Sequence, residues 1–453
     1  MDKTKKEKIF KLLHETLSTT TFHGLPNLAR ATNRLQFFYW LSFTLISTCL
    51  CIFLVVCEIN NFFDYDVVTK IRSYQENKVL FPRVVLCTQN MFETKYAREF
   101  LLNITRLNNL TNVFDENVMS EFNSSEKTRL INILISKAKT VVNRPDFPDD
   151  IRRKFGYSIE DTLFECDFNA KPCNLTRDFS WHFNPNYGNC FTHKAEEIKF
   201  QPGPFKGLYL VMYTSFDERF KFFQQKLGLV VHIINETSVG LRSDVKLILP
   251  GFRTEFAIKR VFQKRAAKPF SECDIENVGD SNESELYGIF LKANKKYTQL
   301  DCFEMCIEKM LASKCNCTRS HLFTEFFNSN VCDQSDECNI KLVEELFDDY
   351  FFIKTCLPMC PLECSKNVFE YSTNLNEINY FNTDRVMKNR ALSSGYTNRT
   401  RLDIDEMRNS LTSLSIYFES FSYELTTESP RTDLTTMFSN IGGAIGKIFM
   451  CLF

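Results

Sequence analysis

The sequence predicts an α+β membrane protein with one transmembrane helix and a large extracellular domain that is rich in disulfides. Three observations lead to this prediction. The run Phe37–Val56 is twenty residues long and contains no charge, no proline and no glycine. The chain has 18 cysteines, most of them after this run. It also has eight N-x-S/T sequons, and none of them precedes the run.

The apolar run is long enough to cross a bilayer. Twenty residues at a rise of about 1.5 Å each span roughly 30 Å, the thickness of the hydrocarbon core. Seven basic residues precede the run, and three acidic residues follow it closely. The positive-inside rule therefore predicts a cytosolic N-terminus at 1–36, a transmembrane helix at 37–57 and an extracellular domain at 58–438. A cleaved signal peptide is the alternative, but the leader and the run are too long for one, and no A-x-A-like site follows.

Length, composition and motifs argue against a disordered chain, a nucleic-acid-binding protein and an enzyme. The chain has 453 residues, a net charge of −1, 44% hydrophobic and 25% charged residues, so it can form a packed core and is not disordered. No basic block follows the leader, which argues against a nucleic-acid partner. The six histidines are scattered, and neither H-E-x-x-H nor G-x-S-x-G occurs, so no motif indicates an enzyme.

Local patterns predict the elements on either side of the membrane helix. The leader carries an amphipathic stretch, Ile9–Leu17, and then His23-Gly24 followed by Pro26, which predicts a chain reversal. After the membrane helix, the apolar run Val79–Cys87 predicts one buried strand, because its proline stands near the start, where a missing N–H is tolerated.

The central and C-terminal parts of the chain predict both helices and strands. Apolar residues at helical spacing predict an amphipathic helix over 124–142, with Ser124 or Ser125 as its N-cap. Short apolar segments separated by turn formers predict a β-rich region over 150–270. The segment Leu411–Leu425 alternates as a strand does, with Leu414, Ile416 and Phe418 on one face and Tyr417, Glu419 and Phe421 on the other.

The cysteines predict an oxidising compartment. Cys49, Cys51 and Cys57 lie in or at the end of the membrane helix and Cys451 lies near the chain end, which leaves fourteen in between. This even, dense set is typical of a disulfide-stabilised domain. Zinc binding is the alternative for the block at 273–364, but zinc sites prefer C-x2-C pairs and the block is predicted to be extracellular.

Spacing within the cysteine block predicts a specific ladder. Two cysteines four residues apart fall in a helical pattern, and a second pair with the same spacing follows a predicted helix at 342–353. Two antiparallel helices with such pairs can be joined by two rungs, Cys302 to Cys360 and Cys306 to Cys356. In the loop between them, Cys315 and Cys317 face Cys332 and Cys338.

A series of motifs in a fixed order resembles one known superfamily over almost the whole chain. The motifs are His23-Gly24, Tyr65 in YDVVTK, FPRVVLCTQN at 81–90, YGNCFT at 187–192, Gly207-Leu208, Tyr297, Cys302-x3-Cys306, Cys315-x-Cys317, Cys360-Pro-x2-Cys364 and NIGGAIG at 440–446. Together they resemble the degenerin / epithelial sodium channel / acid-sensing ion channel superfamily, including its invertebrate, peptide-gated branches. The fourteen predicted extracellular cysteines are the number needed for the seven disulfides that are typical of the acid-sensing branch.

The resemblance implies a trimeric, amiloride-blockable sodium or cation channel of the plasma membrane. Each subunit would have two membrane helices and an ectodomain made of a palm β-sheet, a helical thumb and finger, a β-ball and a knuckle. The implied partners are membrane lipid, sodium or other cations, related subunits in a homo- or heterotrimer, and an extracellular ligand, either a peptide or a proton. No cofactor, metal or nucleic acid is implied.

The resemblance also implies roles for individual residues. The gating residues would be His23, Gly24, Tyr65, Phe270, Gly442 and Gly443. Phe270 stands where the family has a tryptophan that packs against the tyrosine, so the indole N–H is lost. The implied disulfides are Cys87–Cys190, Cys166–Cys173, Cys273–Cys364, Cys302–Cys360, Cys306–Cys356, Cys315–Cys338 and Cys317–Cys332. The candidate glycosylation sites are Asn103, Asn109, Asn123, Asn174, Asn235, Asn282, Asn316 and Asn398.

The C-terminal segment 439–453 departs from the family pattern. In the family it leads into the second membrane helix, which carries a G-x-S selectivity filter; in this chain we expect neither the filter nor the helix. We expect the sequence to be incomplete at this end. A non-conducting regulatory or dominant-negative subunit and a single-pass surface receptor are the alternative functions.

Overall fold

The computed structural model describes residues 3–20, 24–194, 196–199, 201–214, 228–234, 245–274, 286, 288–289, 297–319, 321–333, 336–346, 349–378 and 411–450. The chain divides into two compact units. Unit 1 consists of Met1–Lys70, Arg265–Glu272 and Thr427–Phe453, and unit 2 consists of Ile71–Lys264 and Cys273–Thr426. The predicted class, α+β with an apolar N-terminal helix and a disulfide-rich domain, is confirmed.

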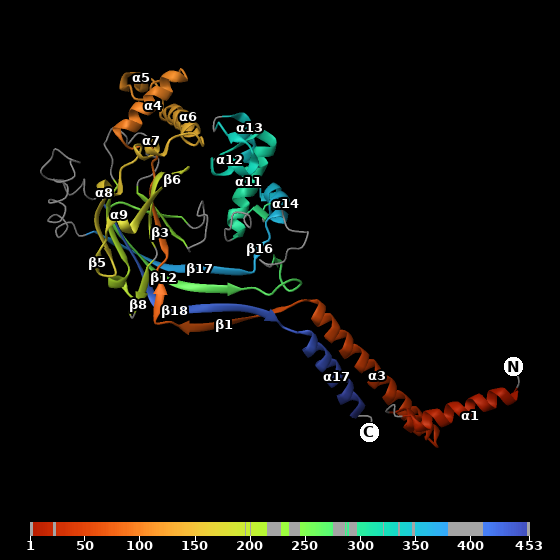
Figure 1. Cartoon of the computed structure of the whole chain (residues 1–453). Coiled ribbons are helices and arrows are strands. Elements are labelled where there is room, and N and C mark those ends of the chain that lie inside the picture. Colours follow the sequence, from red (N-terminus) through yellow and green to blue (C-terminus); the bar gives the residue numbers. More distant parts are fainter. Residues whose placement is uncertain are drawn as a thin grey trace. The chain divides into compact units, whose positions relative to one another are not determined.

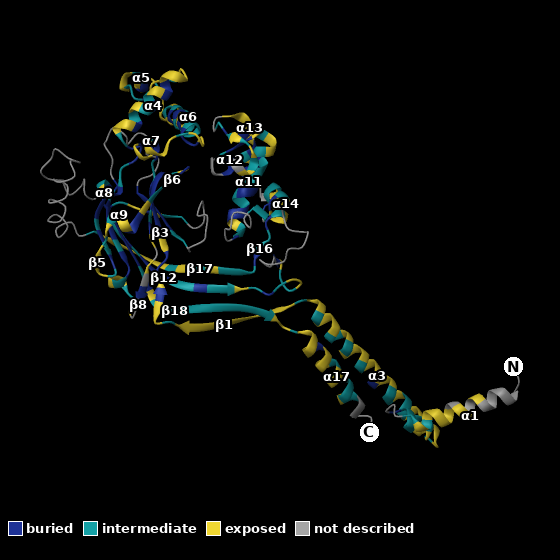
Figure 2. Ribbon diagram, in the orientation of Figure 1, coloured by how far each residue is buried: buried dark blue, intermediate teal, exposed yellow. Residues whose placement is uncertain are grey.

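Unit 1 is built on a long apolar helix. Helix α3 spans Arg34–Phe63 and so extends beyond the predicted 37–57 at both ends. Ser47 is its one buried residue, and its other side chains are exposed or half-buried (Figure 2). Among the residues that the structure describes, α3 is the one helix long and apolar enough to cross a membrane. An apolar helix that its own chain leaves uncovered is suited to a lipid environment.

Besides α3, the described part of unit 1 contains three helices and the ends of the strands β1 (Val67–Gln75) and β18 (Leu411–Pro430). Helices α1 (Lys3–Thr19) and α2 (Leu25–Ala29) precede α3, and α17 (Leu434–Met450) lies beside it (Figure 1). The segment 439–453, in which we expected no second membrane-spanning helix, is helical up to residue 450 as part of α17. At about 1.5 Å per residue, however, α17 is shorter than the hydrocarbon core is thick.

Two interactions stabilise helix α17, one local and one tertiary. Its N-terminus is capped, because the Asp433 carboxylate accepts a hydrogen bond from the backbone N–H of Thr436 at 2.7 Å. It also packs against α3, which supplies tertiary contacts. These contributions offset the two adjacent glycines, each of which weakens a helix interior by about 1 kcal/mol relative to alanine.

The larger sheet has seven strands. Its order is β17-β12-β18-β9-β4-β5, and β1 also pairs with β18. Strands β12 and β17 pair antiparallel over their whole length, from Phe252 opposite Glu377 to Lys264 opposite Ser365. The strands are β1 (Val67–Gln75), β4 (Leu163–Phe168), β5 (Lys171–Pro172), β9 (Leu208–Tyr213), β12 (Phe252–Lys264), β17 (Ser365–Glu377) and β18 (Leu411–Pro430).

A second sheet packs with the larger one around a shared core. Its order is β11-β10-β3-β7-β6, and each neighbouring pair of strands is antiparallel. Phe81 is fully buried in the shared core, with ring centroids 5.2 Å from Phe168 and 5.9 Å from Phe418. The strands are β3 (Arg83–Thr88), β6 (Phe179–Asn184), β7 (Gly188–His193), β10 (Leu229–Ile234) and β11 (Lys246–Ile248).

The predicted single strand Val79–Cys87 is two strands. Strand β2 (Lys78–Leu80) pairs with β8 (Glu197–Lys199), whereas β3 pairs with β7 and β10 in another sheet. Pro82 separates them, because proline has no N–H to donate to a ladder. The N–H of Phe81 instead donates to the carbonyl oxygen of Glu196 at 2.8 Å.

The face assignment of the C-terminal strand is partly wrong. Leu414, Ile416 and Phe418 are buried in the shared core as predicted, but Phe421 lies in that core too. Its ring centroid is 6.3 Å from that of Phe418. The period of two therefore does not continue past residue 419, and core packing outweighs strict alternation there.

Helices cover one end of the second sheet and have their own core. Helix α6 (Ser124–Val142) has the predicted bounds, but its N-cap is Asn123 rather than a serine. Asn123 accepts from the N–H of Glu126 at 2.9 Å, and the Glu126 carboxylate accepts from the N–H of Asn123 at 3.3 Å, which makes a capping box. The other helices of this core are α4 (Lys95–Leu107), α5 (Glu116–Ser120) and α7 (Asp149–Arg153), whereas α8 (Ile159–Thr162) and α9 (Leu175–Asp178) pack against the shared core of the sheets.

The cysteine block folds into short helices that are cross-linked by disulfides. The region of the helix predicted at 342–353 contains α13 (Glu337–Leu346) and α14 (Asp349–Thr355), and residues 347–348 lie outside the described residues. The remaining elements are the helices α11 (Gln299–Cys315) and α12 (His321–Phe327), the 3-10 helices η1 (Pro204–Lys206) and η3 (Leu357–Met359), and the strands β13 (Cys273–Asp274), β14 (Cys317–Thr318), β15 (Asn330–Val331) and β16 (Leu362–Glu363).

All fourteen cysteines between the membrane helix and Cys451 form disulfides. The pairs are Cys87–Cys190, Cys166–Cys173, Cys273–Cys364, Cys302–Cys360, Cys306–Cys356, Cys315–Cys338 and Cys317–Cys332. They coincide with the pairs that the family resemblance implies. No thiol of this set is left to ligate zinc.

Candidate functional site

The candidate functional site is the part of unit 1 where two helices continue into two strands. Helix α3 ends at Phe63 and β1 begins at Val67, while β18 ends at Pro430 and α17 begins at Leu434. The strands β1 and β18 pair with each other, and α3 and α17 pack against each other. We call residues 64–68, 265–272 and 427–433 the helix–strand junction.

An aromatic contact at this junction joins two of the predicted gating residues. The ring centroids of Tyr65 and Phe270 are 5.5 Å apart, and the rings are perpendicular at 90°. The rings of Phe62 and Phe63 each lie 6.1 Å from that of Tyr65. Edge-to-face pairs of this kind contribute about 0.5–1.5 kcal/mol beyond simple burial. Phe270, which stands where the family has a tryptophan, therefore keeps an aromatic contact with Tyr65 without the indole N–H.

The backbone of Tyr65 departs from the helix that precedes it. Its φ is 52°, in the left-handed region that residues other than glycine seldom adopt. The N–H of Tyr65 donates to the carbonyl oxygen of Phe62 at 3.3 Å, which ends the helix in a tight turn. The turn directs the following residues into β1.

Polar contacts join the strand ends in the same junction. The N–H of Arg431 donates to the carbonyl oxygen of Asp66 at 2.8 Å, and the two side chains form an ion pair at 3.1 Å. The N–H of Ala266 donates to the Glu428 carboxylate at 3.3 Å, and the Ser429 hydroxyl donates to the carbonyl oxygen of Val68 at 3.4 Å. Each of the three segments of the junction therefore contacts another.

The two glycines of the predicted gating set lie on α17. Gly442 and Gly443 are exposed, and a methyl group added to either one meets no atom within 4 Å among the residues that the structure describes. Two residues before them, the Asn440 amide donates to the Glu58 carboxylate of α3 at 3.1 Å. Within this chain, no steric contact in the described part requires glycine at either position.

The His-Gly motif is described at the glycine only, because His23 lies outside the described residues. Gly24 is buried, and its φ of 88° is one that a residue with a Cβ rarely adopts. The carbonyl oxygen of Gly24 accepts a hydrogen bond from the N–H of Leu28 at 3.1 Å, which starts α2. Position 24 therefore has a physical requirement for glycine.

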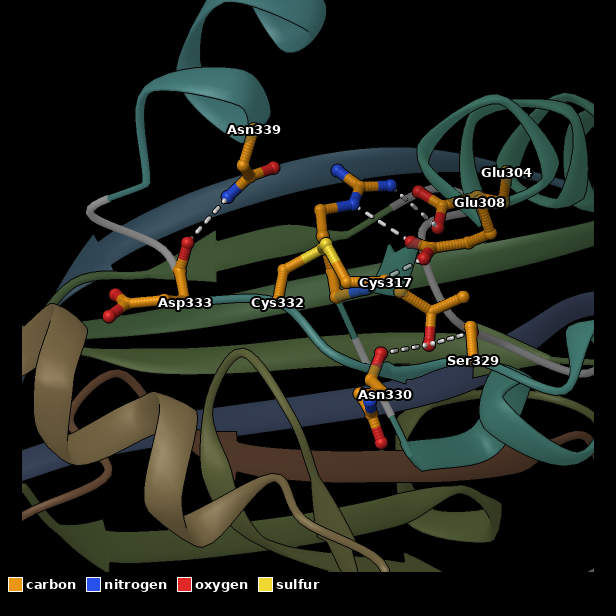
Figure 3. A network of polar contacts seen from close by, with 10 residues as sticks. Glu304, Glu308, Cys317, Ser329, Asn330, Cys332, Asp333 and Asn339 are labelled. Carbon is orange, nitrogen blue, oxygen red and sulfur yellow. Dashed lines mark hydrogen bonds and ion pairs between the residues drawn. A yellow bond between two sulfur atoms is a disulfide. The ribbon is translucent and has the colours of Figure 1, made fainter. Parts of the chain in front are cut away.

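A buried charged network lies in unit 2, between α11 and β14 (Figure 3). Arg319 donates from its side chain and from its backbone N–H to the two oxygens of Glu308, both at 2.8 Å. A second guanidinium nitrogen lies 3.8 Å from Glu304. Burial raises the pKa of Glu308, and the charge and hydrogen bonds of Arg319 oppose that rise. This network holds β14 on the helix that carries Cys302 and Cys306.

Several residues of the helix–strand junction carry no local sequence signal that marks them as partners. Asp66 and Arg431 lie 365 positions apart, and Glu428 bonds a backbone N–H 162 positions away. The opposite charges of Asp66 and Arg431 are the one feature of the sequence that suggests a pair. With 55 basic and 56 acidic residues in the chain, charge alone does not show which two form an ion pair.

Comparisons with known proteins agree with this architecture. The family model described as amiloride-sensitive sodium channel matches residues 16–450. Epithelial sodium channel subunit gamma-2 of Xenopus laevis is 24% identical over 308 residues, a match to 65% of this chain and 44% of that protein. Epithelial sodium channel subunit alpha of Mus musculus is 24% identical over 293 residues, a match to 62% and 39%. The match therefore spans less than half the length of these epithelial sodium channel relatives.

A shorter relative matches over most of both chains. The bile acid-sensitive ion channel of Homo sapiens is 22% identical over 442 residues, which is 96% of this chain and 82% of that protein. A solved proton-activated chloride channel covers 90% of this chain at 8% identity and a TM-score of 0.35, which is too distant to establish a shared fold. The superfamily resemblance seen in the sequence motifs is confirmed by the family match. The chain belongs to the amiloride-sensitive sodium channel family.

Proposed function

We propose that this chain is a subunit of a trimeric, amiloride-sensitive sodium or cation channel in the plasma membrane. Family membership supports a sodium-channel subunit, and the relatives are named as epithelial sodium channel subunits and a bile acid-sensitive ion channel. The N-terminus is cytosolic and residues 58–438 are extracellular, in keeping with the basic leader and the sequons that follow α3.

The observation that carries the proposal is the helix–strand junction. Paired strands lead directly into paired helices, and the Tyr65–Phe270 contact and the Asp66–Arg431 link brace the turns between them. A displacement of β1 and β18 therefore reaches the ends of α3 and α17 through three or fewer intervening residues on each side. Such an arrangement couples an extracellular ligand, a peptide or a proton, to the membrane helices.

The trimer is supported by the surface of α17. Two neighbouring glycines, Gly442 and Gly443, are exposed on a helix that packs on one side against α3. Small residues let membrane helices approach closely, so this surface suits helices of neighbouring subunits.

The experiment begins with the transcript read beyond the codon for Phe453. The complete product is then expressed in oocytes, alone and with a related subunit, and sodium current is recorded with and without amiloride. We expect an amiloride-blocked current that is reduced in Phe270→Ala and retained in Phe270→Trp at equal surface expression. Absence of current alone, together with a reduced current from the co-expressed subunit, would establish the regulatory alternative. A monomer at the surface that alters no current would refute both channel roles.

A further inference from the structure

Five of the eight predicted glycosylation sequons lie in the described residues, and their asparagines are all exposed. They are Asn103, Asn109, Asn123, Asn174 and Asn316. Exposure of the asparagine is not sufficient for N-glycan transfer, because the transferase also has to reach the hydroxyl of the serine or threonine two residues later. The burial of that second residue divides the sequons into open and closed ones.

The sequon Asn316-Cys317-Thr318 is closed in the folded chain. Thr318 is fully buried, with an exposed fraction of 0%. Its hydroxyl lies 3.5 Å from the carbonyl oxygen of Asn330 and 3.4 Å from the Ser329 hydroxyl, and both partners are seen beside the disulfide in Figure 3. The backbone is occupied as well, since the carbonyl oxygen of Thr318 accepts from the N–H of Cys332 at 2.8 Å.

One disulfide secures this closed state. Cys317 is the middle residue of the sequon, and it bonds Cys332 across the short parallel pair of β14 and β15. Thr318 is buried by that pairing, in which it lies opposite Val331. The two-residue strands β14 and β15 form only two register pairs, so the covalent link supplies most of what holds them together.

Two other sequons serve as references. In Asn174-Leu175-Thr176 the threonine is exposed, although the Cys166–Cys173 disulfide ends immediately before the sequon. In Asn103-Ile104-Thr105 the threonine is 5% exposed, and its hydroxyl donates to the carbonyl oxygen of Leu101 at 2.9 Å inside α4. The first sequon is therefore open beside a disulfide, and the second is closed by a helix rather than by a disulfide.

We propose that Asn316 is an N-glycan acceptor only until the Cys317–Cys332 disulfide closes. Transfer to Asn316 and closure of that disulfide compete during folding, so the two events have a fixed order in every glycosylated chain. The disulfide does not control transfer to Asn174 or Asn103. This proposal rests on the extracellular placement of residues 58–438 under the proposed function.

The experiment measures glycan occupancy at each sequon by mass spectrometry of the full chain expressed in animal cells. The variant Cys332→Ser leaves the Asn316 sequon intact and removes the disulfide. The matched control Cys166→Ser removes the disulfide next to Asn174 and leaves that sequon intact. We expect Asn316 occupancy to rise from a minority of chains to most chains in Cys332→Ser and to stay at its original level in Cys166→Ser, while Asn174 occupancy stays high in both.

Three outcomes would overturn the proposal. Equal Asn316 occupancy in the original chain and in Cys332→Ser, with Asn174 occupied, refutes it alone. An equal rise at Asn103 in Cys332→Ser shows general unfolding rather than release of one sequon. Absence of glycan at every sequon refutes the extracellular placement as well. Because the variant can misfold, a brief pulse of reductant during synthesis of the unaltered chain is the second measurement, and it has to raise Asn316 occupancy more than Asn103 occupancy.

Discussion

Replacing His193 is expected to reduce the amount by which the free energy of unfolding falls when the pH is lowered. His193 on β7 is 1% exposed, its ring centroid lies 5.0 Å from that of Phe168 and 5.3 Å from that of Phe179, and its Nδ1 has no hydrogen-bond partner among the described residues. Burial lowers the pKa of His193 to about 4, and the charge of Asp178 opposes this only in part. The side chain is therefore neutral in the folded protein at physiological pH.

The magnitude follows from the difference between the two pKa values. The unfolded chain binds the proton near pH 6.5, whereas the folded chain binds it near pH 4. Between these values the unfolded state holds more protons, so the free energy of unfolding falls as the pH falls. Each pH unit costs about 1.4 kcal/mol, which gives a loss of about 3 kcal/mol at pH 4 relative to pH 7.

The test compares His193→Leu with the unaltered chain in detergent micelles. Leucine has nearly the volume of histidine and does not titrate, so the variant is expected to keep its unfolding temperature far better as the pH is lowered from 7 to 4.5. The control His182→Leu removes a half-buried histidine whose pKa is also lowered by burial, and it leaves His193 in place. Parallel pH dependence of His193→Leu and the unaltered chain would refute the reasoning.

Three further predictions concern the junction and the buried network. Tyr65→Ala and Phe270→Ala are each expected to weaken coupling, and a double-mutant cycle on channel opening should give about 0.5–1.5 kcal/mol between them; additive effects would disprove the contact. Gly442→Ala should raise the stability of the isolated subunit by up to about 1 kcal/mol in thermal unfolding, since no residue that the structure describes obstructs the methyl group, and a loss of stability would contradict this. Arg319→Met should cost about 3–5 kcal/mol by leaving Glu308 buried and unpaired, and the added change Glu308→Leu should restore most of it; no rescue would contradict the role of the buried charge.

The sequence was most informative where structure is local or covalent. The spacing of apolar residues predicted α6 with its bounds, since a helix repeats every few residues and needs no distant partner. It predicted the two rungs 302–360 and 306–356 for the same reason, because residues four apart on a helix share a face. The apolar run predicted α3 by length alone.

The errors share a different cause. Pro82 divides one apolar run into strands of two sheets, and this could be seen only when β8 and β7 were available as partners. Phe421 joins the core against the alternation of its own strand because Phe418 and the cluster around it offer burial. In each case a long-range contact outweighed the local pattern.

By itself the sequence determined the apolar helix, the oxidising character of the cysteine-rich domain and membership of the family, because length, composition and ordered motifs are read along the chain. Only the tertiary structure decided which residues meet at the helix–strand junction and which sequons are closed. The Asp66–Arg431 pair and the burial of Thr318 each depend on segments that are distant in sequence or joined by a disulfide. Such contacts form only when the chain packs, because packing places one of many chemically equivalent residues beside its partner.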